Sequence, residues 1–593
     1  MNIDLLRALR LISETSLTNQ RQLSMQLNIS LGKINRIVTE LQDQKLIEAQ
    51  VVPYRITAQG MELLKEYRVD SAIILAAGTG ERIVPLSFDK PKALLRVKGE
   101  RLIERLIEQL HEREIYDVTV VIGYMKEKME YLSDKYGVKL IYNPQFDATN
   151  SVTSLSLASS QIRNTYVIPS DVYFTENIFN KYEFQSWIGA VNDPNKPTYW
   201  SIETGTNKRV TAIIGDSEAT TVNTIYGPSY IAKEQARALS HYVQNDSRLS
   251  FKSGFFWENS IADHLKDFPI YANIFENSII YEFDTFEQLR EFDAAYQDDS
   301  QSRIISIICD VYNITPLEIS DIQTLKKGMT NDSFLFTVRN KRFVFRMPGR
   351  GTDALINRKE EGDVYTQIDT LRIADSLYYF NPDTGYKISR FYDGAKPITY
   401  DDYSTAFGIL RNLHTSNLHV DHEFVLSERI KFYKSLCDDA DATYFEDFAE
   451  VSSIVEEVVT IIEGMNRPKV LAHIDPVIDN FIKIQNGTIK LIDWEYAAMA
   501  DPYLDLAMHA IYSGFNQTQI DDITAIYLEE QPTDTQQHLV YGYVALGGFL
   551  WALWTLFKEA KGENFGTYGL EQYQYARTYG RKFLEFNRSE HEA

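Results

Sequence analysis

Short apolar runs alternate with segments of helical periodicity between Val69 and about Gln297. In chain order the apolar runs read SAIILAAG, DVTVVIGY, VKLIYN and NTYVIPSD. Strands that alternate with helices in this way are typical of a sheet whose faces are covered by the helices. The pattern predicts an α/β domain over residues 69–297 with a mostly parallel sheet.

A polar joint, YQDDSQS, precedes the last region, residues 298–593. The segments SFLFTV and RFVFRM predict a β-hairpin, and from about Tyr400 the spacing is mainly helical. We therefore expect a small lobe that contains a sheet, followed by a larger helical lobe. Leu539–Phe557 is a run of nineteen residues without a charge, but it contains glycines, tyrosines and tryptophans. We interpret it as a buried helix and expect no membrane insertion.

Residues 1–68 show helical spacing followed by a short extended element. Ser30 is a candidate N-cap for LGKINRIVTELQDQKLI, in which one apolar stripe is formed by Ile34, Ile37, Val38 and Leu41. The following segment, AQVVPYRITAQG, has the composition of a small wing. Helix, turn, helix and wing together resemble the winged helix-turn-helix family, and this resemblance covers residues 1–68 alone.

Composition and length agree with a soluble protein of several domains. The chain has 593 residues, of which 44% are apolar and 24% charged, and this length predicts roughly three or four domains. Its two cysteines, Cys309 and Cys437, are too far apart in sequence to suggest a metal knuckle or a disulfide framework. With no secretion signal visible, we expect a cytoplasmic protein.

Charge is unevenly distributed along the chain. The net charge is −23; residues 1–68 contain nine Lys plus Arg against seven Asp plus Glu, which is +2, so the remainder carries −25. Only the N-terminal region could approach nucleic acid without strong repulsion. The winged-helix resemblance implies a DNA-facing surface with Lys33, Asn35 and Arg36. The alternative is a docking or dimerising module.

A glycine-rich loop follows the first apolar run, in the segment AAGTGERIVPLSFDKPKALLRV. It lacks the Gly-Lys-Ser/Thr ending of a Walker A loop and the third glycine of a dinucleotide fingerprint. Glycines nevertheless allow backbone N–H groups to approach phosphate oxygens, and Arg82 and Lys92 can neutralise a triphosphate. Nucleotide contacts are predicted for Ala77, Gly78, Thr79, Gly80, Arg82 and Lys92.

This segment resembles the signature of the sugar-nucleotide transferase superfamily, in which a GxGxR-x-x-P loop is followed by Pro-Lys. The resemblance implies a Rossmann-like fold and nucleotidyl transfer, with Arg82 and Lys92 as catalytic residues. That chemistry requires a metal at the α-phosphate, and oxygen ligands suit Mg²⁺. Asp171 and Asp284 occupy the positions where the superfamily has its metal carboxylates, although either could instead cap a strand end.

Two further stretches, NSVTSLSLA and FFWENSIADHL, resemble the phosphocholine cytidylyltransferases of bacteria that decorate their surfaces with phosphocholine. The resemblance implies CTP as the nucleotide and a phosphocholine site with Asn150, Trp257 and Glu258. A quaternary ammonium has no hydrogen-bond donor, so a π face and a carboxylate are its best partners. In the alternative interpretation, Trp257 fills the core and Glu258 lies outside.

The segment LAHIDPVIDNFIKIQNGTIKLIDWEYA contains His-x-Asp, an Asn five residues later, and a strand that ends in Asp. It resembles the catalytic loop of choline and aminoglycoside kinases. The resemblance implies that Asp475 is the base near the attacking hydroxyl and that Asn480 and Asp493 bind Mg²⁺. An inactive relic is the alternative, and His-Ile-Asp-Pro departs from the commoner His-Asn-Asp-Leu.

Upstream, LKKGMTNDSFLFTVRNKRFVFRM would supply the ATP contacts of such a kinase. The turn over the phosphates is expected to include Gly328, Thr330, Asn331 and Ser333. Arg346 stands where most protein kinases have lysine, in agreement with choline kinases, and should pair with Glu361 rather than Glu360.

The uncharged segment also resembles the stretch where choline kinases build an aromatic wall around the ammonium group. Trp551 and Trp554 are three residues apart and so share a helix face, while Glu495 would supply negative charge. Both tryptophans could instead be core residues.

Together these resemblances imply a bifunctional bacterial choline kinase and CTP:phosphocholine cytidylyltransferase. Choline and ATP would give phosphocholine, which with CTP would give CDP-choline and pyrophosphate. One alternative is the same chemistry on ethanolamine or another amino alcohol. Another is a DNA-binding regulator whose enzyme-like domains sense ligands.

Overall fold

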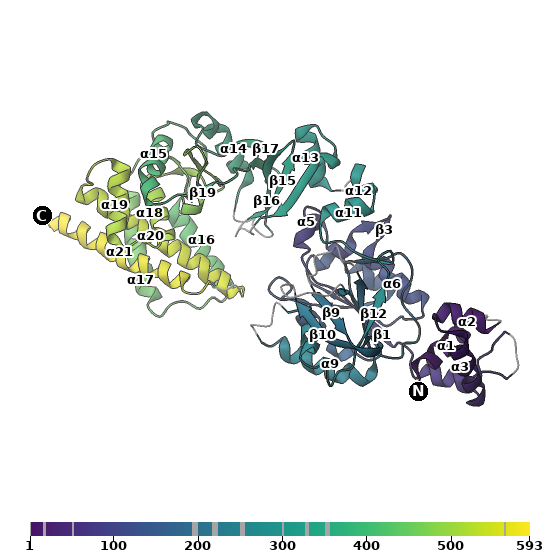
Figure 1. Ribbon diagram of the computed structural model, residues 1–593. Helices are drawn as coiled ribbons and strands as arrows, with labels where there is room; N and C mark the ends of the chain where they lie inside the picture. The colour runs from purple at the N-terminus through teal and green to yellow at the C-terminus, as the bar shows by residue number, and fades with distance from the viewer. Residues whose placement is uncertain are drawn as a thin grey trace. The chain divides into compact units, whose positions relative to one another are not determined.

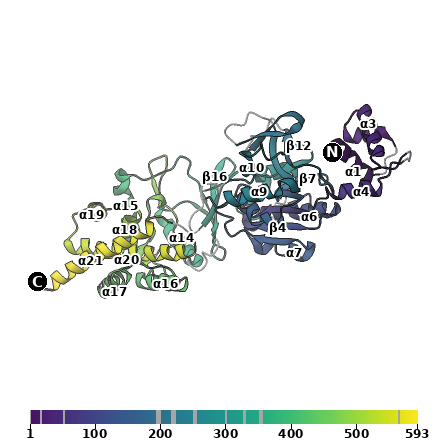
Figure 2. The ribbon, with the colours of Figure 1, turned by 90° about the horizontal axis from the view of Figure 1, so that it is seen from below.

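The chain divides into two compact units, Met1–Leu317 and Glu318–Ala593. The computed structural model describes residues 2–15, 19–49, 53–192, 200–215, 223–249, 255–298, 302–325, 331–349, 356–562 and 565–592. Figure 1 and Figure 2 label the elements of both units and colour the chain from the N-terminus to the C-terminus.

The N-terminal region is helical. Its elements are α1 (Ile3–Glu14), α2 (Gln20–Leu27), α3 (Leu31–Asp43) and α4 (Ala58–Lys65). The predicted stripe on α3 is buried throughout, at Ile34, Ile37, Val38 and Leu41. Ser30 precedes α3, but its side chain makes no capping hydrogen bond.

An antiparallel bridge joins Ile47 to Ile56, whereas residues 50–52 of the predicted wing lie outside the described residues. The winged helix therefore stays a prediction.

This helical region shares its apolar core with the α/β domain that follows. Tyr182, which belongs to the α/β domain, is buried among the N-terminal helices, and Phe184 packs against the same cluster. Arg10 NH1 on α1 donates a hydrogen bond to the carbonyl oxygen of Tyr182 at 3.0 Å. Both regions accordingly belong to the first compact unit.

Within the described residues, nine strands form the main sheet of this unit, and seven of them follow the order β10-β9-β11-β6-β1-β4-β5. The neighbours in the row β6-β1-β4-β5 are parallel. β11 runs antiparallel to β6, β8 and β9, so the sheet is mixed rather than mostly parallel as predicted. A short connection joins β9 to β10, and such a connection permits antiparallel pairing alone.

The strand bounds of this sheet are β1 Ser71–Ala76, β4 Val118–Ile122, β5 Lys139–Tyr142, β6 Thr165–Pro169, β8 Trp187–Asn192, β9 Trp200–Thr204, β10 Val210–Gly215, β11 Asn223–Ile231 and β12 Tyr271–Phe275. β12 pairs with β8. Smaller elements include α5 (Leu86–Asp89), β2 (Arg96–Val97), β3 (Glu100–Arg101) and α10 (Asn259–Ala262).

Helices cover both faces of the sheet because successive strand residues point to opposite sides. Ile74 packs in a cluster with the apolar residues of α6 (Leu102–Glu112) and α7 (Tyr131–Tyr136). Its neighbour Ile73 packs in another cluster with α8 (Ser151–Leu157) and α9 (Lys233–Asp246). The predicted layers of helix, sheet and helix are therefore present.

A two-stranded ribbon brings the two predicted metal carboxylates of this unit to the same place. β7 (Val172–Phe174) follows Asp171, and β13 (Ile280–Glu282) precedes Asp284. The strands are antiparallel, with Glu282 opposite Val172. Asp171 and Asp284 thus leave the ribbon at the same end.

The first unit ends with α11 (Phe286–Phe292), α12 (Ala295–Asp298) and α13 (Arg303–Tyr312). The predicted domain boundary after residue 297 precedes α13, which is tied to the first unit by a hydrogen bond of 3.3 Å from Ser302 Oγ to Asp89 Oδ2.

The second unit begins with a five-stranded sheet in the order β14-β15-β16-β18-β17. β15 (Asn331–Val338) and β16 (Lys341–Pro348) form the predicted hairpin. The remaining elements of this lobe are β14 (Ile319–Thr324), β17 (Leu377–Asn381), β18 (Tyr386–Arg390) and α14 (Arg358–Ile368).

Most of the second unit is helical, as predicted. Its helices are α15 Tyr403–His414, α16 Leu426–Asp439, α17 Phe448–Gly464, α18 Tyr503–Tyr512, α19 Gln517–Leu528, α20 Asp534–Ala560 and α21 Tyr568–Glu592. Short strands lie between them: β19 Lys396–Pro397, β20 Val470–Ala472, β21 Phe481–Lys483, β22 Ile489–Leu491 and β23 Ala498–Ala500. α20 is long and apolar enough to cross a membrane, yet 94% of its apolar window is buried inside this unit.

Candidate active sites

The first unit contains a pocket of about 750 Å³ at the carboxyl ends of β1 and β6. Every site residue predicted in the α/β domain lines it: Ala77, Gly78, Thr79, Gly80, Arg82, Lys92, Asn150, Asp171, Trp257, Glu258 and Asp284. Gly80 has a φ of 68°, a left-handed conformation that favours glycine. A Cβ atom at Gly80 would lie 3.2 Å from the Lys92 Cβ, so the loop passes close to that lysine.

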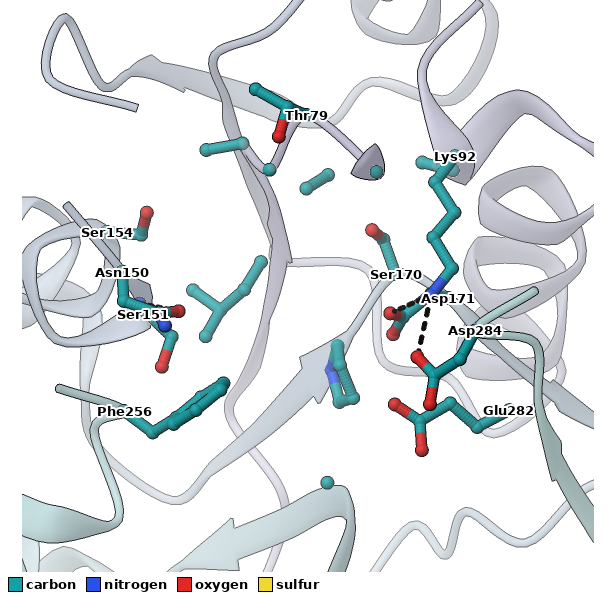
Figure 3. A pocket seen from close by; sticks show the side chains of 18 of the residues that line it. Thr79, Lys92, Asn150, Ser151, Ser154, Ser170, Asp171, Phe256, Glu282 and Asp284 are labelled. Atoms are coloured by element: carbon teal, nitrogen blue, oxygen red, sulfur yellow. Dashed lines mark hydrogen bonds and ion pairs between the residues drawn. The ribbon is translucent and has the colours of Figure 1, made fainter. Parts of the chain in front are cut away.

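One wall of this pocket is charged. Lys92 Nζ lies 2.8 Å from Asp171 Oδ2 and 3.6 Å from Asp284 Oδ1, as Figure 3 shows. Arg82 NH2 lies 2.9 Å from the same Asp284 oxygen. Burial alone would lower the pKa of Lys92, but the surrounding carboxylates outweigh it and raise this pKa. Lys92 in turn holds the pKa of Asp171 below its usual value against the effect of burial. Lys92 and Asp171 thus stabilise each other in their charged forms.

The opposite wall is formed by α8 and by aromatic residues. Asn150, Ser151 and Ser154 point into the pocket from one side, next to Phe256 (Figure 3). The Trp200 and Phe256 rings meet edge to face, with 5.9 Å between their centroids. Both line the pocket, and the sequence analysis missed both. The sequence gives little indication of either residue. Trp200 lies far from the motifs that contain the other site residues, and Phe256 is next to Trp257, to which the ammonium contact was assigned.

Trp257 and Glu258 both line the pocket, but they differ in how much of each side chain belongs to the core. Only 2% of Trp257 is exposed, and its ring packs in the apolar cluster under α8 and α9, so most of this side chain is core. Glu258 is also buried, yet it lines the pocket. Burial raises the pKa of Glu258 to about 7. A carboxyl group in this setting gains most from a cationic ligand.

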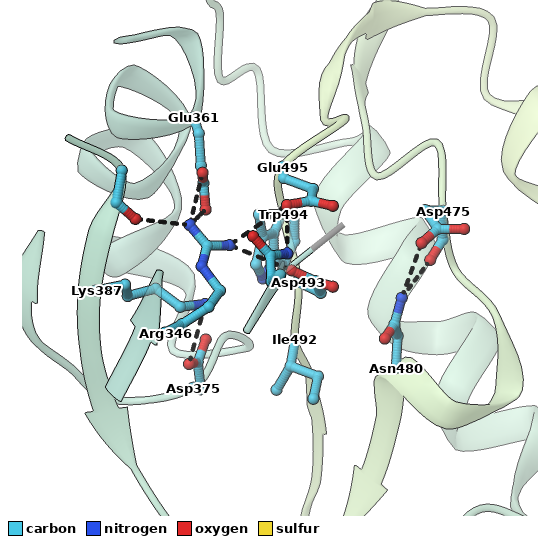
Figure 4. Close-up of polar contacts among 12 residues, drawn as sticks. Arg346, Glu361, Asp375, Lys387, Asp475, Asn480, Ile492, Asp493, Trp494 and Glu495 are labelled. Atoms are coloured by element: carbon cyan, nitrogen blue, oxygen red, sulfur yellow. Dashed lines mark hydrogen bonds and ion pairs between the residues drawn. The ribbon is translucent and has the colours of Figure 1, made fainter. Parts of the chain in front are cut away.

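In the second unit, the predicted catalytic loop brings its polar residues together. Asn480 Nδ2 donates to the backbone oxygen of Asp475 at 2.9 Å and to its Oδ2 at 3.2 Å (Figure 4). The other carboxylate oxygen, Asp475 Oδ1, is buried and has no hydrogen-bond partner among the described residues. Burial raises the pKa of Asp475 well above its usual value, and the negative charges of Asp493 and Glu495 add to the effect.

A buried aspartate on α18 fixes the backbone of this loop. Ile474 has a φ of 69°, which is strained for a β-branched residue. Asp505 accepts hydrogen bonds from the backbone N–H groups of His473 and Ile474, at 2.9 Å and 2.7 Å. His414 also bonds to this carboxylate, at 2.9 Å. These contacts hold the strained residue in place and so position Asp475.

Arg346 contacts Glu361, the partner predicted for it, at 2.6 Å. Its NH1 also lies 3.4 Å from Asp493 Oδ1 (Figure 4). Ser333 lies opposite Arg346 in the hairpin register. Asn331 Nδ2 donates to Glu495 Oε2 at 2.8 Å. Of the predicted phosphate turn, Gly328 and Thr330 lie outside the described residues.

A second, smaller pocket adjoins Asp475. Its other lining residues are Phe424, Arg429, Tyr433, Ile474, Tyr496, Met508, Leu550 and Trp551. Trp554 lies behind Trp551, with 5.6 Å between the ring centroids, and is 6% exposed. The predicted wall is therefore made of Trp551 and two tyrosines that the sequence analysis missed, whereas Trp554 is a core residue.

Glu495 does not belong to this aromatic pocket. Its carboxylate lies 2.9 Å from Arg358 NH1 and 3.6 Å from Arg346 NH1. Two arginines from the sheet-bearing lobe neutralise its charge, and the contact of Glu495 with the ammonium group stays a prediction.

Two family models match the chain. Residues 72–186 match the MobA-like NTP transferase domain, and residues 322–580 match choline/ethanolamine kinase. The choline-phosphate cytidylyltransferase of Streptococcus pneumoniae is 31% identical over 229 residues, which are 39% of this chain and 99% of that protein. The chain belongs to the choline-phosphate cytidylyltransferase family. It combines a cytidylyltransferase domain with a choline kinase domain.

The kinase domain has relatives of its own. Protein LicA of Haemophilus influenzae is 25% identical over 260 residues, which are 41% of this chain and 96% of that protein. The crystal structure of choline kinase LicA from Streptococcus pneumoniae is 28% identical, with a TM-score of 0.41, and the match covers 47% of this chain and 100% of that one.

The described residues of neither domain could enclose a metal ion by protein side chains alone. Within the described ranges, no three His, Cys, Asp or Glu side chains form a cluster that could hold one. Each domain does offer side chains with oxygen donors at the predicted positions, Asp171 and Asp284 in the first and Asn480 and Asp493 in the second. Mg²⁺ commonly takes one or two protein ligands and completes its shell with phosphate oxygens and water. The donor sets therefore fit Mg²⁺ that arrives with a nucleoside triphosphate.

The three residues predicted to face DNA, Lys33, Asn35 and Arg36, are exposed on α3, and the first two contact neighbouring helices. Lys33 Nζ donates to Asp4 of α1, and Asn35 Oδ1 accepts a hydrogen bond of 3.2 Å from Gln20 Nε2 of α2. Both matching family models begin after this region, at residues 72 and 322.

Proposed function

We propose that the two domains catalyse consecutive reactions on choline. The kinase domain would transfer the γ-phosphoryl group of ATP to choline, and the cytidylyltransferase domain would join the resulting phosphocholine to CMP from CTP, with release of pyrophosphate. The observation that carries the proposal is that aromatic side chains lie beside the proposed catalytic residues of both domains. Trp200 and Phe256 line the pocket that contains Lys92, and Trp551 lines a cavity of about 20 Å³ that contains Asp475. The product, CDP-choline, would serve phosphocholine decoration of the cell surface.

In the kinase reaction, Asp475 Oδ1 would accept the hydroxyl proton of choline as the alcohol oxygen attacks the γ-phosphorus. This oxygen accepts no hydrogen bond from the described residues, which leaves it available as a general base. Arg346 would neutralise the phosphate oxygens, and Asn480 and Asp493 would hold Mg²⁺. The rings of Tyr433, Tyr496 and Trp551 would surround the trimethylammonium group through cation–π contacts.

In the cytidylyl transfer, a phosphate oxygen of phosphocholine would attack the α-phosphorus of CTP and displace pyrophosphate. Lys92 and Arg82 would neutralise the charge that grows on the phosphate oxygens, and the backbone N–H groups of the glycine loop would bind the triphosphate. Asp171 and Asp284 would hold Mg²⁺, which when bound polarises the reacting phosphate in both domains.

Glu258, Phe256 and Trp200 would receive the ammonium group of phosphocholine in the cytidylyltransferase domain. All three side chains line the pocket, and Figure 3 shows Phe256 across the pocket from Lys92, so the cationic end of the substrate would lie away from this lysine. Asn150 would contribute a polar contact beside them.

The aromatic lining favours choline over ethanolamine, whose primary ammonium needs hydrogen-bond acceptors more than π faces. Purified protein incubated with ATP, Mg²⁺ and either amino alcohol would test this. The proposal requires a higher kcat/KM for choline in the release of ADP, whereas a preference for ethanolamine would contradict it. A ligand-sensing regulator would turn over neither compound.

The exposed Arg36 on α3 favours a second, separate proposal that the N-terminal helices bind DNA. Fluorescence anisotropy with a labelled duplex at low salt tests it. Arg36→Ala should weaken binding and reduce the slope of log K against log salt by about 0.9, the contribution of one phosphate contact. A wild-type protein that does not bind duplex DNA at low salt would refute this proposal.

A further inference from the structure

Four buried charged residues form a closed ring in the kinase domain. Arg346 contacts Glu361 at 2.6 Å, and Glu361 contacts Arg358 NH1 at 2.9 Å. The same Arg358 nitrogen lies 2.9 Å from Glu495 Oε2, which lies 3.6 Å from Arg346 NH1. No side chain in this ring is more than 6% exposed. The ring is therefore shielded from the solvent that weakens most surface ion pairs.

Arg358 connects three segments that are distant in sequence. It lies on α14, one turn before Glu361, and reaches Glu495 in the segment after β22. Its second nitrogen, NH2, donates to Asn331 Oδ1 at 3.1 Å, at the first residue of β15. Asn331 also donates to Glu495, so the start of β15 and the segment that contains Asp493 are joined directly. Figure 4 shows Glu495 beside Asp493 and Arg346, whereas Asp475 and Asn480 form a separate pair.

We propose that Arg358 is a positioning residue for phosphoryl transfer. It fixes Glu361, which orients Arg346, and it fixes Glu495, which lies two residues from Asp493. Arg358 thereby fixes the position of Arg346, the cation proposed to bind the phosphates, relative to Asp493, a proposed metal ligand. The Arg358 side chain itself would touch neither substrate. This inference rests on the kinase roles proposed above for Arg346 and Asp493.

The chemistry of guanidinium explains why this position holds arginine. A planar guanidinium group donates in several fixed directions, so one Arg358 side chain serves two carboxylates and an amide at once. A lysine ammonium would keep the charge but could not reproduce this fork. Removal of the Arg358 cation would leave the buried carboxylates of Glu361 and Glu495 without enough neighbouring positive charge to balance their own, which is strongly unfavourable.

The test compares Arg358→Lys, Arg358→Met and Asn331→Ala in the full-length protein. Partners of metal and phosphate ligands commonly change affinity or activity by about 10- to 100-fold when they are replaced, so we expect losses of that size in kinase kcat/KM for ATP. The Mg²⁺ concentration for half-maximal kinase rate should rise as well, whereas KM for choline should change less than twofold. Pyrophosphate release by the cytidylyltransferase domain serves as an internal control.

Lys359→Met is the matched control, because Lys359 neighbours Arg358 on α14 but its side chain is 75% exposed. If Arg358→Met fails to fold, the lysine and Asn331 variants carry the test, since both keep the buried charges balanced. Wild-type values of KM for ATP and of Mg²⁺ dependence in Arg358→Lys and Asn331→Ala would overturn the inference. A wild-type protein without choline-dependent ADP release would instead refute the proposed function.

Discussion

Asn480 Nδ2 lies 3.2 Å from Asp475 Oδ2, whereas the second carboxylate oxygen of Asp475 is buried and has no hydrogen-bond partner among the described residues. One oxygen is thus used to orient the side chain and the other is free to receive a proton.

Replacement of Asp475 by alanine should abolish the kinase reaction and leave cytidylyl transfer intact. Loss of a general base commonly lowers the rate by about 10²- to 10⁴-fold. Choline-dependent ADP release and phosphocholine-dependent pyrophosphate release measure the two activities in the same sample. Asp479→Ala is the control, because Asp479 is exposed on the same loop. Equal loss of both activities in Asp475→Ala would show that the two sites are not independent.

Asp171→Ala should have the opposite effect. This substitution removes one of the two oxygen donors proposed for Mg²⁺ and the 2.8 Å partner of Lys92. We expect pyrophosphate release to fall by at least about 10²-fold, the scale of a lost electrostatic contact to the reacting phosphate. ADP release should stay at the wild-type rate. Asp134→Ala, at an exposed residue of α7, is the control for the same unit.

The pH dependence of the cytidylyltransferase reaction should follow Glu258. Its pKa is raised by burial to about 7, so the carboxyl group is mostly neutral at pH 6 and mostly ionised at pH 8. The ionised form attracts the ammonium group, and kcat/KM for phosphocholine should rise about tenfold over this interval. In Glu258→Gln the profile should lose this rise. A rise of equal size in both proteins would contradict the assignment.

The same shift predicts a change in stability. The pKa of Glu258 in the folded protein, about 7, exceeds its ordinary value of 4.5, so the protonated form favours folding. The stabilisation of the folded state by protonated Glu258 is fully present below pH 4.5 and is lost as pH rises through about 7. Glu258→Gln should therefore raise the melting temperature of the first unit relative to wild type at pH 8, with little difference near pH 4.5.

Trp551 and Trp554 should respond differently to replacement. Trp551 lines the pocket beside Asp475, so Trp551→Ala should raise KM for choline by roughly 30-fold, equivalent to a desolvated cation–π contact of about 2 kcal/mol. The effect on ethanolamine should be smaller. Trp554→Ala should instead destabilise the kinase domain by about 3–5 kcal/mol, the usual cost of truncating a buried tryptophan. Similar effects on KM in both variants would contradict the difference in their roles.

Local spacing was sufficient to predict the elements and the residues that lie close together in sequence. Asp475 and Asn480 are five residues apart on one loop, and their side chains meet as the motif implies. The alternation of strands and helices predicted the layers around β1. It did not predict the antiparallel partners of β11, because strand direction depends on connections that hydrophobic patterns do not encode.

Contacts between distant segments could not be predicted from the sequence. Glu495 lies two residues after Asp493, and this spacing predicts a role at the aromatic pocket. Its carboxylate instead accepts a hydrogen bond from Arg358, which is 137 residues away in sequence. A tryptophan beside a glutamate predicts an ammonium contact at Trp257. Its neighbour Phe256 is, however, the more exposed aromatic residue in that pocket. Which of two adjacent aromatics faces a cavity is decided by tertiary packing.

A single time course tests the two-step activity most directly. Purified protein is incubated with choline, ATP, CTP and Mg²⁺, and ³¹P NMR follows the phosphorus resonances. The proposed function predicts a phosphomonoester signal that rises first and then declines as the diphosphate diester of CDP-choline and free pyrophosphate appear. Absence of both the phosphomonoester and pyrophosphate over the course of the incubation would contradict it.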